Sequence, residues 1–499
     1  MKKYNVIILT LLWPLLSAEA ATTDSSYVER HSLWRQTYCE ALQNPALMTH
    51  AYLKPFTELS LRCDYRHQSE AFQIEQGTGY VKPGLSAQAY IRLTPSSVVW
   101  GEASYGNGKQ YHQRYNNVAD FDLLYPDVIA DSLGGDTHRE NYFFAGGYAT
   151  EQGNWLLGGE LKFRAEQDYR TSDPRMRSIV SDLTLKAGAA RRLAHYHLGV
   201  SLEGNIYRQT ADVDFYGEQN GMGELQMTGL GTNYTRFSGS NRDIFYEGKG
   251  GAITFDLQPG TTTGWVAHLS HEWHQYERLL DEYNSLPLTT LYRQQNRLTL
   301  GWKQQSGVSE RALMLHADYD KRASDEHVVG TSSGQEYPIL TQLTMYRQHH
   351  WDVGATVLYG YRAWHLQLRA GYMNHREQYA YVERNLTYAR VYGELIAQYL
   401  KTVNESLRLN IYAKGGYAAN VDSRIVMPYA NMSASIKSYI NHNYQYQKAS
   451  YAQAMGGIRA DYQPAAWSVG LYAQMATAWQ FCSEGDQEAN LHVSIGIMF

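Results

Sequence analysis

Apolar and polar residues alternate over most of the chain, from Thr57 to the C-terminus. In the last segment, apolar residues occupy one set of alternate positions, namely Leu491, Val493, Ile495, Ile497 and Phe499, and mostly small or polar residues occupy the other. Successive side chains of a β-strand point to opposite faces, so this period of two predicts strands with one apolar face. The same alternation recurs in segments such as 351–359, 364–372 and 467–475. The chain is therefore predicted to be all-β.

The connectors between these segments alternate between short and long. Short turns are expected near residues 95–96, 150–153, 192–195, 258–262, 304–308, 361–363, 402–404 and 463–466. Long polar loops are expected near residues 67–85, 107–139, 166–178, 209–242, 277–289, 321–349, 375–386, 420–448 and 480–489. Outer-membrane β-barrels have short periplasmic turns and long external loops.

Counting the strands between these connectors gives about 18, within a range of about 16–20, because boundaries read from sequence err by several residues. An even count places both chain ends on the periplasmic side. The sequence therefore predicts a transmembrane antiparallel up-and-down β-barrel over residues 56–499. Glycines within 244–257 blur the alternation, which favours a bulge there.

Tryptophan positions agree with membrane-spanning strands. Five lie near predicted short turns and three near the start of long loops: Trp155, Trp265, Trp302, Trp364 and Trp467, then Trp273, Trp351 and Trp479. Trp265 and Trp273 are eight positions apart on one strand. At ~3.3 Å per residue and a tilt of about 45°, that spacing approaches the ~25 Å apolar band of such barrels. We expect these residues and Phe499 to form aromatic girdles at the two membrane surfaces.

The N-terminus begins with Met1-Lys2-Lys3, an apolar run and a small-residue site ending at Ala20. This pattern is typical of a cleaved secretory signal peptide over residues 1–20. Residues 21–55 precede the first strand and form either a periplasmic segment or a lumen plug. Within them, residues 28–42 are expected to form a short helix that ends at Asn44-Pro45, because the residue before proline avoids the helical conformation.

Composition narrows the classes of protein. The chain has 499 residues, 42 Tyr and 11 Trp, and a formal net charge of -5 with mixed signs, which argues against a nucleic-acid partner. The mean hydropathy of -0.49 does not exclude a membrane protein, since alternating strands average out. Three widely spaced cysteines, Cys39, Cys63 and Cys482, predict no disulfide framework. No linker marks a second domain, so one barrel is expected.

Three short segments resemble known families. The terminal strand ending in Phe499 resembles the signal by which Gram-negative outer-membrane barrels are recognised for insertion. Residues 98–109, after the hairpin at 91–95, resemble an uncharacterised family of Bacteroidota outer-membrane β-barrels. Asn44-Pro45-Ala46 is similar to a segment of the long-chain fatty-acid transporter family, where it belongs to a lumen plug.

These resemblances imply a place in the cell outer membrane and contact with outer-membrane lipid and lipopolysaccharide. They also imply recognition by the barrel-assembly machinery through the C-terminal strand, and an accessory role beside an energised outer-membrane receptor.

Strand parity places charged residues of both signs inside the barrel. The predicted lumen residues are Arg92, Glu160, Lys162, Arg164, Glu272, His268, His316, Asp318, Arg369, Arg408, Arg459 and Asp461. A charge on the lipid face would cost ~2–4 kcal/mol near the midplane, so consistent inward parity supports the barrel. These side chains either line an aqueous pore or pair with each other and fill the interior.

The inward histidines are the only candidates for chemistry. His268, Glu272 and His274 are spread over ~13–20 Å of one strand, which is too far for a single metal ion. We therefore expect no metal and no cofactor. No nucleophile, phosphate loop or nucleotide fingerprint is present, so no enzyme activity is expected.

Three functions remain open. The first is a porin-like or accessory transport barrel that admits a small solute. The second is a structural or receptor barrel that binds a partner through tyrosine-rich loops, although these tyrosines would equally pack on each other: Tyr111, Tyr115, Tyr125, Tyr216, Tyr429, Tyr439, Tyr444 and Tyr446. The third is a transporter of hydrophobic molecules, suggested by Asn44-Pro45-Ala46.

Overall fold

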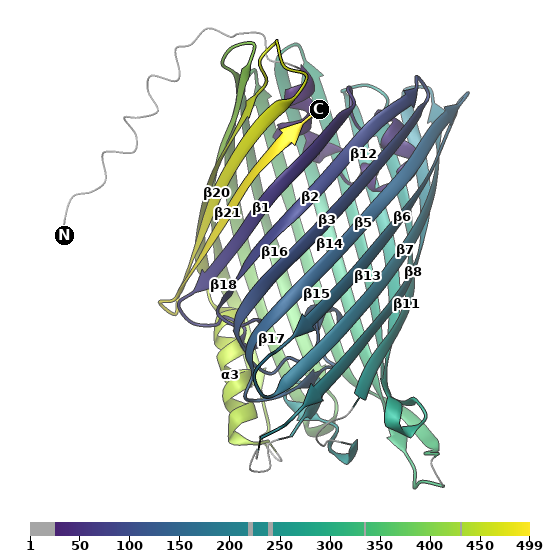
Figure 1. The fold of residues 1–499 in the computed structure, drawn as a ribbon, viewed down its shortest axis with the longest axis vertical. Coiled ribbons are helices and arrows are strands. Elements are labelled where there is room, and N and C mark those ends of the chain that lie inside the picture. Colours follow the sequence, from purple (N-terminus) through teal and green to yellow (C-terminus); the bar gives the residue numbers. More distant parts are fainter. Residues whose placement is uncertain (1–24, 218–222, 238–242, 334–335, 430–431) are drawn as a thin grey trace, which may run out of the picture.

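A single closed sheet forms the wall of the molecule (Figure 1). The computed structural model describes residues 25–217, 223–237, 243–333, 336–429 and 432–499, so the predicted signal peptide lies outside the described residues. Eighteen strands follow one another around the sheet, each antiparallel to the next, and β1 pairs with β21 to close it. The prediction of an up-and-down antiparallel β-barrel with 18 strands is confirmed.

The wall strands are β1 (Phe56–Gln68), β2 (Gly79–Thr94), β3 (Ser97–Gln113), β5 (Gly135–Gln152), β6 (Trp155–Tyr169), β7 (Arg175–Leu193), β8 (Tyr196–Asp214), β11 (Asp243–Pro259), β12 (Gly264–Leu280), β13 (Leu286–Ser306), β14 (Ser309–Val329), β15 (Ile339–Tyr361), β16 (Trp364–Tyr379), β17 (Arg384–Thr402), β18 (Leu407–Val426), β19 (Tyr451–Tyr462), β20 (Gly470–Cys482) and β21 (Gln487–Met498). No helix in the described part of the chain is long and apolar enough to cross a membrane.

The barrel closes where the last strand meets the first. Leu59 lies opposite Ile497 and Leu61 opposite Ile495, so the apolar faces of β1 and β21 are continuous. Beyond β21, Phe499 and Thr57 exchange two backbone hydrogen bonds, with N···O distances of 2.9 and 3.3 Å. Closure leaves no unpaired strand edge, which is the condition for a sheet to lie in lipid.

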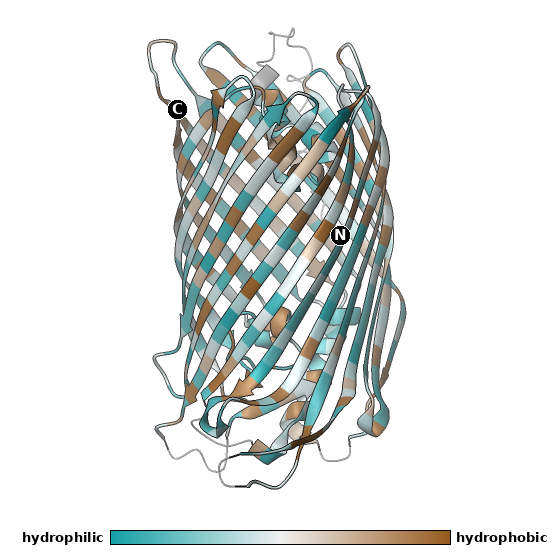
Figure 2. Ribbon diagram, turned by 90° about the vertical axis from the view of Figure 1, so that its right-hand side faces the viewer, coloured by the Kyte–Doolittle hydropathy of each residue, from teal (hydrophilic) through white to brown (hydrophobic). Residues whose placement is uncertain are grey.

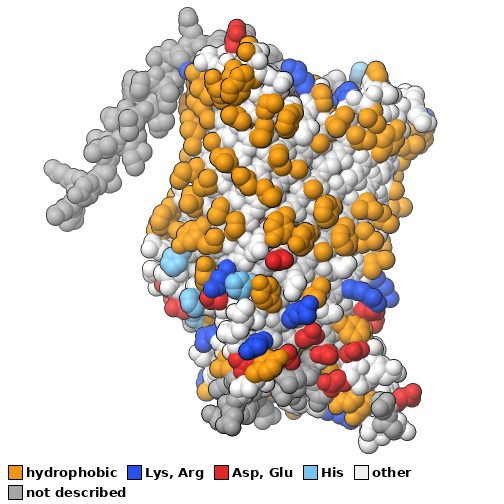
Figure 3. All heavy atoms as spheres, viewed as in Figure 1, with side chains coloured by type: hydrophobic (Ala, Val, Ile, Leu, Met, Phe, Trp, Pro, Cys, Tyr) orange, Lys and Arg blue, Asp and Glu red, His pale blue; other side chains and the backbone are white. Residues whose placement is uncertain are grey.

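The outer surface carries an apolar band. Side chains on alternate positions remain exposed, such as Leu202 at 59% and Ile206 at 63% on β8, and Figure 2 shows the alternation along the strands that face the viewer. In Figure 3 the hydrophobic side chains cover the upper part of the wall, and charged side chains gather toward the long-loop end. The wall therefore projects beyond the band on that side.

The wall is much taller on one side than on the other. β13, β14 and β15 have 21, 21 and 23 residues, whereas β19, β20 and β21 have 12, 13 and 12. The sequence placed loops at 166–178, 277–289, 321–349 and 375–386, but the connectors there are only 170–174, 281–285, 330–338 and 380–383. These boundaries were wrong because strands that continue past the membrane are polar on both faces and read as loop.

The bulge expected in β11 is absent. β11 pairs in continuous register with β8 and β12, from Asp243 to Pro259 and from Ile244 to Leu257. Its glycines make room for large rings of β12 instead. A Cβ at Gly248 would lie 2.6 Å from the Tyr276 ring, and one at Gly250 would lie 2.1 Å from the His274 ring.

The segment before the first strand lies inside the short-turn end of the barrel. It forms α1 (Ser25–His31) and three short 3-10 helices, η2 (Leu33–Thr37), η3 (Ala41–Gln43) and η4 (Pro45–His50). The single helix expected over 28–42 is therefore wrong. The helix breaks at Ser32, and the Gln398 side chain of β17 accepts a hydrogen bond from the Leu33 backbone N–H at 2.9 Å.

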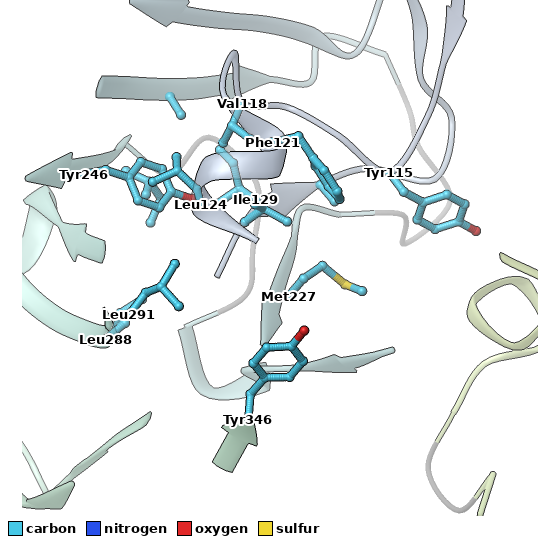
Figure 4. Packing of buried hydrophobic residues seen from close by; sticks show 14 of the residues in the cluster. Tyr115, Val118, Phe121, Leu124, Ile129, Met227, Tyr246, Leu288, Leu291 and Tyr346 are labelled. Atoms are coloured by element: carbon cyan, nitrogen blue, oxygen red, sulfur yellow. The ribbon is translucent and has the colours of Figure 1, made fainter. Parts of the chain in front are cut away.

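The long loops fold inward at the opposite end and build a hydrophobic cap. It contains η5 (Ile74–Gln76), α2 (Phe121–Leu124), η6 (Thr235–Phe237), η7 (Asp281–Tyr283), α3 (Ala434–Lys448), and a small sheet of β4 (Ile129–Ala130), β9 (Leu225–Gly229) and β10 (Thr232–Asn233). The short η8 (Tyr381–Glu383) forms the turn between β16 and β17. Figure 4 shows Phe121, Leu124 and Ile129 of the loop packed with Tyr246 and Tyr346, which project from the wall.

Candidate functional site: the lumen

Charged side chains line the middle of the lumen. Nη2 of Arg369 on β16 lies 3.0 Å from Nε2 of His316 on β14. The same atom lies 3.7 Å from the Asp352 carboxylate on β15. The Tyr392 hydroxyl on β17 donates a hydrogen bond to Asp352 at 2.6 Å. Two predicted lumen residues, His316 and Arg369, thus meet in one cluster built by four neighbouring strands.

Other mid-lumen charges form local pairs. Arg297 bonds Asp318 at 2.8 Å across β13 and β14, and Lys162 bonds Glu160 at 2.9 Å along β6. Glu272 lies on the inward face of β12, opposite Ala252. The side chains of Lys162 and Arg369 keep 41% and 37% of their surface exposed. Such accessible, oppositely charged groups are suited to lining a water-filled passage.

Predicted lumen residues nearer the short-turn end hold the N-terminal segment. Arg459 bonds both Asp461 and Glu58, at 2.9 and 3.0 Å, and Glu58 also bonds Arg30 of α1 at 3.1 Å. This group is almost fully buried, with only 1% of the Asp461 side chain exposed. Its members anchor a structural contact, since a buried ion pair that loses one partner is costly.

Arg92 and Arg408 also lie at this end. Arg92 donates hydrogen bonds to the carbonyls of Thr49 and Tyr52, at 3.3 and 3.2 Å. Arg408 lies opposite Asp461 on the inward face of β18 and borders a cavity beside α1. Both positions therefore face the N-terminal segment.

His268 belongs to a second anchor of the N-terminal segment. Its Nδ1 lies 2.7 Å from Asp256 on β11, and the Asn44 side-chain amide donates to the other oxygen of Asp256 at 3.3 Å. Asn44, Asp256 and His268 are 0%, 1% and 2% exposed. Asn44 also accepts a hydrogen bond from the Ala46 N–H and so begins η4.

Three glycines form the seat for residues 44–46. Gly158, Gly188 and Gly199 occupy inward positions of β6, β7 and β8. A Cβ at Gly158 would lie 2.4 Å from the Pro45 carbonyl, and one at Gly188 would lie 2.0 Å from the Asn44 Oδ1. Only hydrogen in place of a side chain lets the segment approach the wall this closely.

Residues 114–134 cross the lumen as part of the cap. On one side, Arg164 of β6 bonds Asp120 at 2.6 Å and the Tyr207 hydroxyl of β8 donates to the same carboxylate at 2.9 Å. On the other side, Arg322 of β14 donates to the Tyr125 carbonyl at 3.1 Å. Arg164, predicted as a lumen residue, thus holds one end of this crossing segment.

Glu377 of β16 holds the other end of this crossing segment. It accepts hydrogen bonds from Tyr125 and Tyr346, both at 3.0 Å, and from His375 at 2.8 Å. Two residues after Tyr125 in the loop, burial raises the pKa of the Asp127 carboxyl to about 7, although Ser324 donates a hydrogen bond to this carboxyl. In the sequence, His375 and Glu377 fell in a predicted loop, and polar residues on both faces gave no signal for their strand.

The histidines named as candidates for chemistry do not come together in one site. His268, His316 and His365 each have a different partner, respectively Asp256, the Arg369 cluster and Glu310. Among the described residues, no group of three or more His, Cys, Asp or Glu side chains could hold a metal ion. Cys39, Cys63 and Cys482 are free thiols.

The predicted girdle residues point outward at two levels. Trp155, Trp265, Trp302, Trp364 and Trp467 lie at the short-turn ends, together with Phe499, which is 62% exposed. Trp273, Trp351 and Trp479 are 45%, 46% and 43% exposed. Trp273 and Trp351 lie within β12 and β15, about seven and twelve residues from the long-loop ends of these strands, because the wall extends past the membrane there.

Most of the loop tyrosines pack inside the cap. Tyr115 and Tyr439 stack with ring centroids 4.4 Å apart, and Tyr446 stacks on Phe72 at 5.0 Å. Tyr444 is 5% exposed, whereas Tyr216 is 67% exposed. Of the two roles left open for these tyrosines, the described part of the loops mainly shows internal packing.

No curated protein matches the sequence. Among solved structures, the chain is similar to the ferric preacinetobactin receptor BauA from Acinetobacter baumannii, with a TM-score of 0.43, 11% identity and coverage of 89% of this chain and 80% of that one. It is also similar to the ferric enterobactin receptor PfeA from Pseudomonas aeruginosa, with a TM-score of 0.39, 8% identity and coverage of 89% and 80%.

A further similar structure is the outer membrane protein opdK from Pseudomonas aeruginosa, with a TM-score of 0.33, 11% identity and coverage of 89% of this chain and 99% of that one. At these values the similarity extends to the barrel fold alone. A sequence family matches residues 45–499, which include η4 and the whole barrel. The chain belongs to this family, which is a family of unknown function (DUF6850).

Proposed function

We propose that this protein is an outer-membrane transport barrel that admits small polar or charged solutes, either alone or as an accessory to another uptake system. The observation that carries the proposal is a belt of accessible, oppositely charged side chains at mid-lumen, such as Lys162 beside Glu160 and Arg369 beside Asp352. A barrel that only filled its interior would bury these groups in pairs, as it does for Arg459 and Asp461.

The same belt argues against a path for hydrophobic molecules. Such a path needs an apolar lining, but Arg297, Asp318, Lys414 and Glu394 face the middle of the lumen as ion pairs. The Asn44-Pro45-Ala46 segment, which suggested hydrophobic transport, is held in a glycine seat and a buried hydrogen-bond network.

The proposed passage has two obstacles in series. The N-terminal segment contacts both sides of the wall at one end, through η4 against β5, β6 and β7 and η2 against β14, β15 and β16. Residues 114–134 cross at the other end, between Arg164 and Arg322. This arrangement supports a narrow passage that depends on the position of the N-terminal segment.

Planar-bilayer recordings in potassium chloride test the proposal with purified wild type and a variant lacking residues 25–53. We expect discrete conductance steps, larger in the deletion variant because one of the two obstacles is gone. Lys162→Glu with Arg369→Glu should shift ion selectivity toward cations, since both side chains are accessible in the lumen. The outcome that rejects transport is silence of both wild type and the deletion variant.

Silence of both proteins would favour the receptor alternative, in which the exterior of the cap binds a ligand. The accessory role has its own test. Protein extracted with mild detergent should bring an energised outer-membrane receptor with it, and recovery of the barrel alone at every detergent concentration would remove that part of the proposal.

A further inference from the structure

A cluster of positive charge lies on the outside of the wall, on β14, β15 and β16, which belong to the far side of Figure 1. Lys321 lies directly opposite His349, and His349 lies directly opposite Arg376. Arg347 is the next outward residue of β15 and lies opposite Ala323 and Gln378. We call Lys321, Arg347, His349 and Arg376 the basic patch.

Strand alternation shows that the basic patch faces away from the lumen. On β15 it shares its face with Trp351, Val353 and Val357, which are 46%, 40% and 49% exposed. On β16, Arg376 shares its face with Leu366 and Leu368, at 43% and 52% exposed. The inward residues between them, such as Glu377, are buried in the cap.

The patch lies immediately beyond the aromatic girdle of the long-loop side. Tyr319 stacks on Trp351 with ring centroids 4.1 Å apart, and the Tyr319 hydroxyl lies 2.8 Å from Nδ1 of His349. Neighbouring outward side chains of a strand, such as Trp351 and His349, are two residues apart. On a tilted strand this spacing moves the second side chain ~5 Å along the membrane normal. This places the cations at headgroup depth, since tyrosine and tryptophan mark the membrane–water boundary.

The patch has no internal counter-charge. In the described residues, no carboxylate forms an ion pair with Lys321, Arg347 or Arg376, and the outward residues opposite them are neutral: Gln294, Ala323, Gln378 and Thr387. The next acid on this face, Asp325, accepts a hydrogen bond from Thr344.

Outward charges elsewhere on the wall are mixed in sign. Arg208 bonds Glu247 across β8 and β11 with 2.5 Å between the atoms, and Lys109 bonds Asp136 at 2.8 Å. Like charges directly opposite on neighbouring strands repel, so a patch of one sign is costly without an external anion.

We propose that the basic patch binds the phosphate groups of a phosphorylated glycolipid in the outer leaflet of the membrane, of the lipopolysaccharide class. Arginine and lysine side chains at this depth can donate charge-assisted hydrogen bonds to phosphate oxygens. The acyl chains of the same lipid would rest on Val353, Val357, Leu366 and Leu368 below the girdle. Several phosphates on one headgroup match cations spread over three strands.

The test compares wild type with Lys321→Gln/Arg347→Gln/Arg376→Gln. A matched control, Arg177→Gln/Arg208→Gln/Lys249→Gln, removes three outward charges from β7, β8 and β11, where acids are interspersed. Each protein is extracted in mild detergent, its closed barrel is verified by gel mobility with and without boiling, and bound glycolipid is counted by native mass spectrometry. We expect about a ten-fold loss or more in the patch variant, with little change in the control.

Added lipids then identify the source of the phosphate. Lipid A carrying two phosphates should rebind to wild type, whereas dephosphorylated lipid A should not. Equal retention by wild type and the patch variant would overturn the proposal, and so would phosphatidylglycerol binding as well as lipid A. If the triple variant does not assemble, Arg347→Gln and Arg376→Gln are measured singly, and a loss in neither overturns it.

Discussion

Gly188 determines how closely the N-terminal segment can approach the wall. A methyl group there would lie 2.0 Å from Oδ1 of Asn44 and 3.0 Å from Cδ of Pro45. Gly188→Ala should therefore displace residues 44–46 and weaken the Asn44–Asp256 contact, at a cost of ~1–3 kcal/mol typical of overpacking. Hydrogen exchange should become faster at the Leu47 and Ala51 amides, which bond Asn44 and Met48 in the wild type.

The control for this change is Gly204→Ala on β8, because a Cβ there meets nothing within 4 Å. Equal protection of Leu47 in Gly188→Ala and wild type would show that the seat does not hold the segment.

Single residues show where sequence patterns are informative. Parity assigned Arg369, His316 and Asp318 to the inward face, because alternation depends only on neighbours along one strand. There the structure has each of them bonded to another inward side chain. Parity could not show that Arg164 bonds the Asp120 carboxylate, or that Arg92 reaches the Thr49 carbonyl. Nor could it show that His268 shares Asp256 with Asn44. Those partners are distant in sequence, and no local pattern links them.

At the scale of elements, the contact between η5 and α3 should depend on pH. Glu75 of η5 is buried and accepts a hydrogen bond from Asn443 of α3 at 2.6 Å, and burial raises its pKa to about 7 from the usual 4.5. Between these values the carboxyl is protonated in the folded cap and ionised in an opened one. The stabilisation is therefore complete below about pH 4.5 and is lost as pH rises to about 7.

A shift of this size corresponds to roughly 3 kcal/mol of differential stability. Hydrogen exchange in α3 should accelerate between pH 5 and pH 8 beyond the intrinsic chemical rate, and Glu75→Gln should remove that excess. Residues near Asp127, whose pKa burial raises in the same direction, should keep their own pH dependence in this variant. If the pH dependence of hydrogen exchange in α3 is the same in Glu75→Gln as in wild type, a group other than Glu75 causes it.

Elements were predicted well where one face meets lipid and poorly elsewhere. The apolar half of each strand was enough to predict that strand and its short turn, as for β16 between Trp364 and Tyr372. The remainder of β16, to Tyr379, is polar outside and packs on the cap inside. The cap has its own hydrophobic core, but its members come from many loops and show no common period.

At the scale of the whole molecule, barrel closure and strand count followed from the alternation of connectors. A lumen plug over residues 21–55 was one of two alternatives, and the layer that residues 114–134 form across the lumen was not predicted. The last residue takes part in closure. Phe499 and Thr57 exchange both of their backbone hydrogen bonds, and the Phe499 ring faces outward at 62% exposure. We expect the barrel-assembly machinery to recognise this end of β21.

Deleting Phe499 should therefore reduce the amount of closed barrel, because it removes both the terminal backbone pairing and the exposed ring. Phe499→Trp keeps the pairing and an aromatic group and should assemble normally, whereas Phe499→Gly keeps only the pairing. The fraction of protein whose gel mobility changes on boiling measures closure. If the glycine variant assembles like wild type while the deletion fails, the backbone bonds to Thr57 suffice and the ring has no part in recognition. If all three assemble equally, β21 pairs with β1 without help from its final residue, and the eleven register pairs from Glu58 to Gln68 alone determine closure.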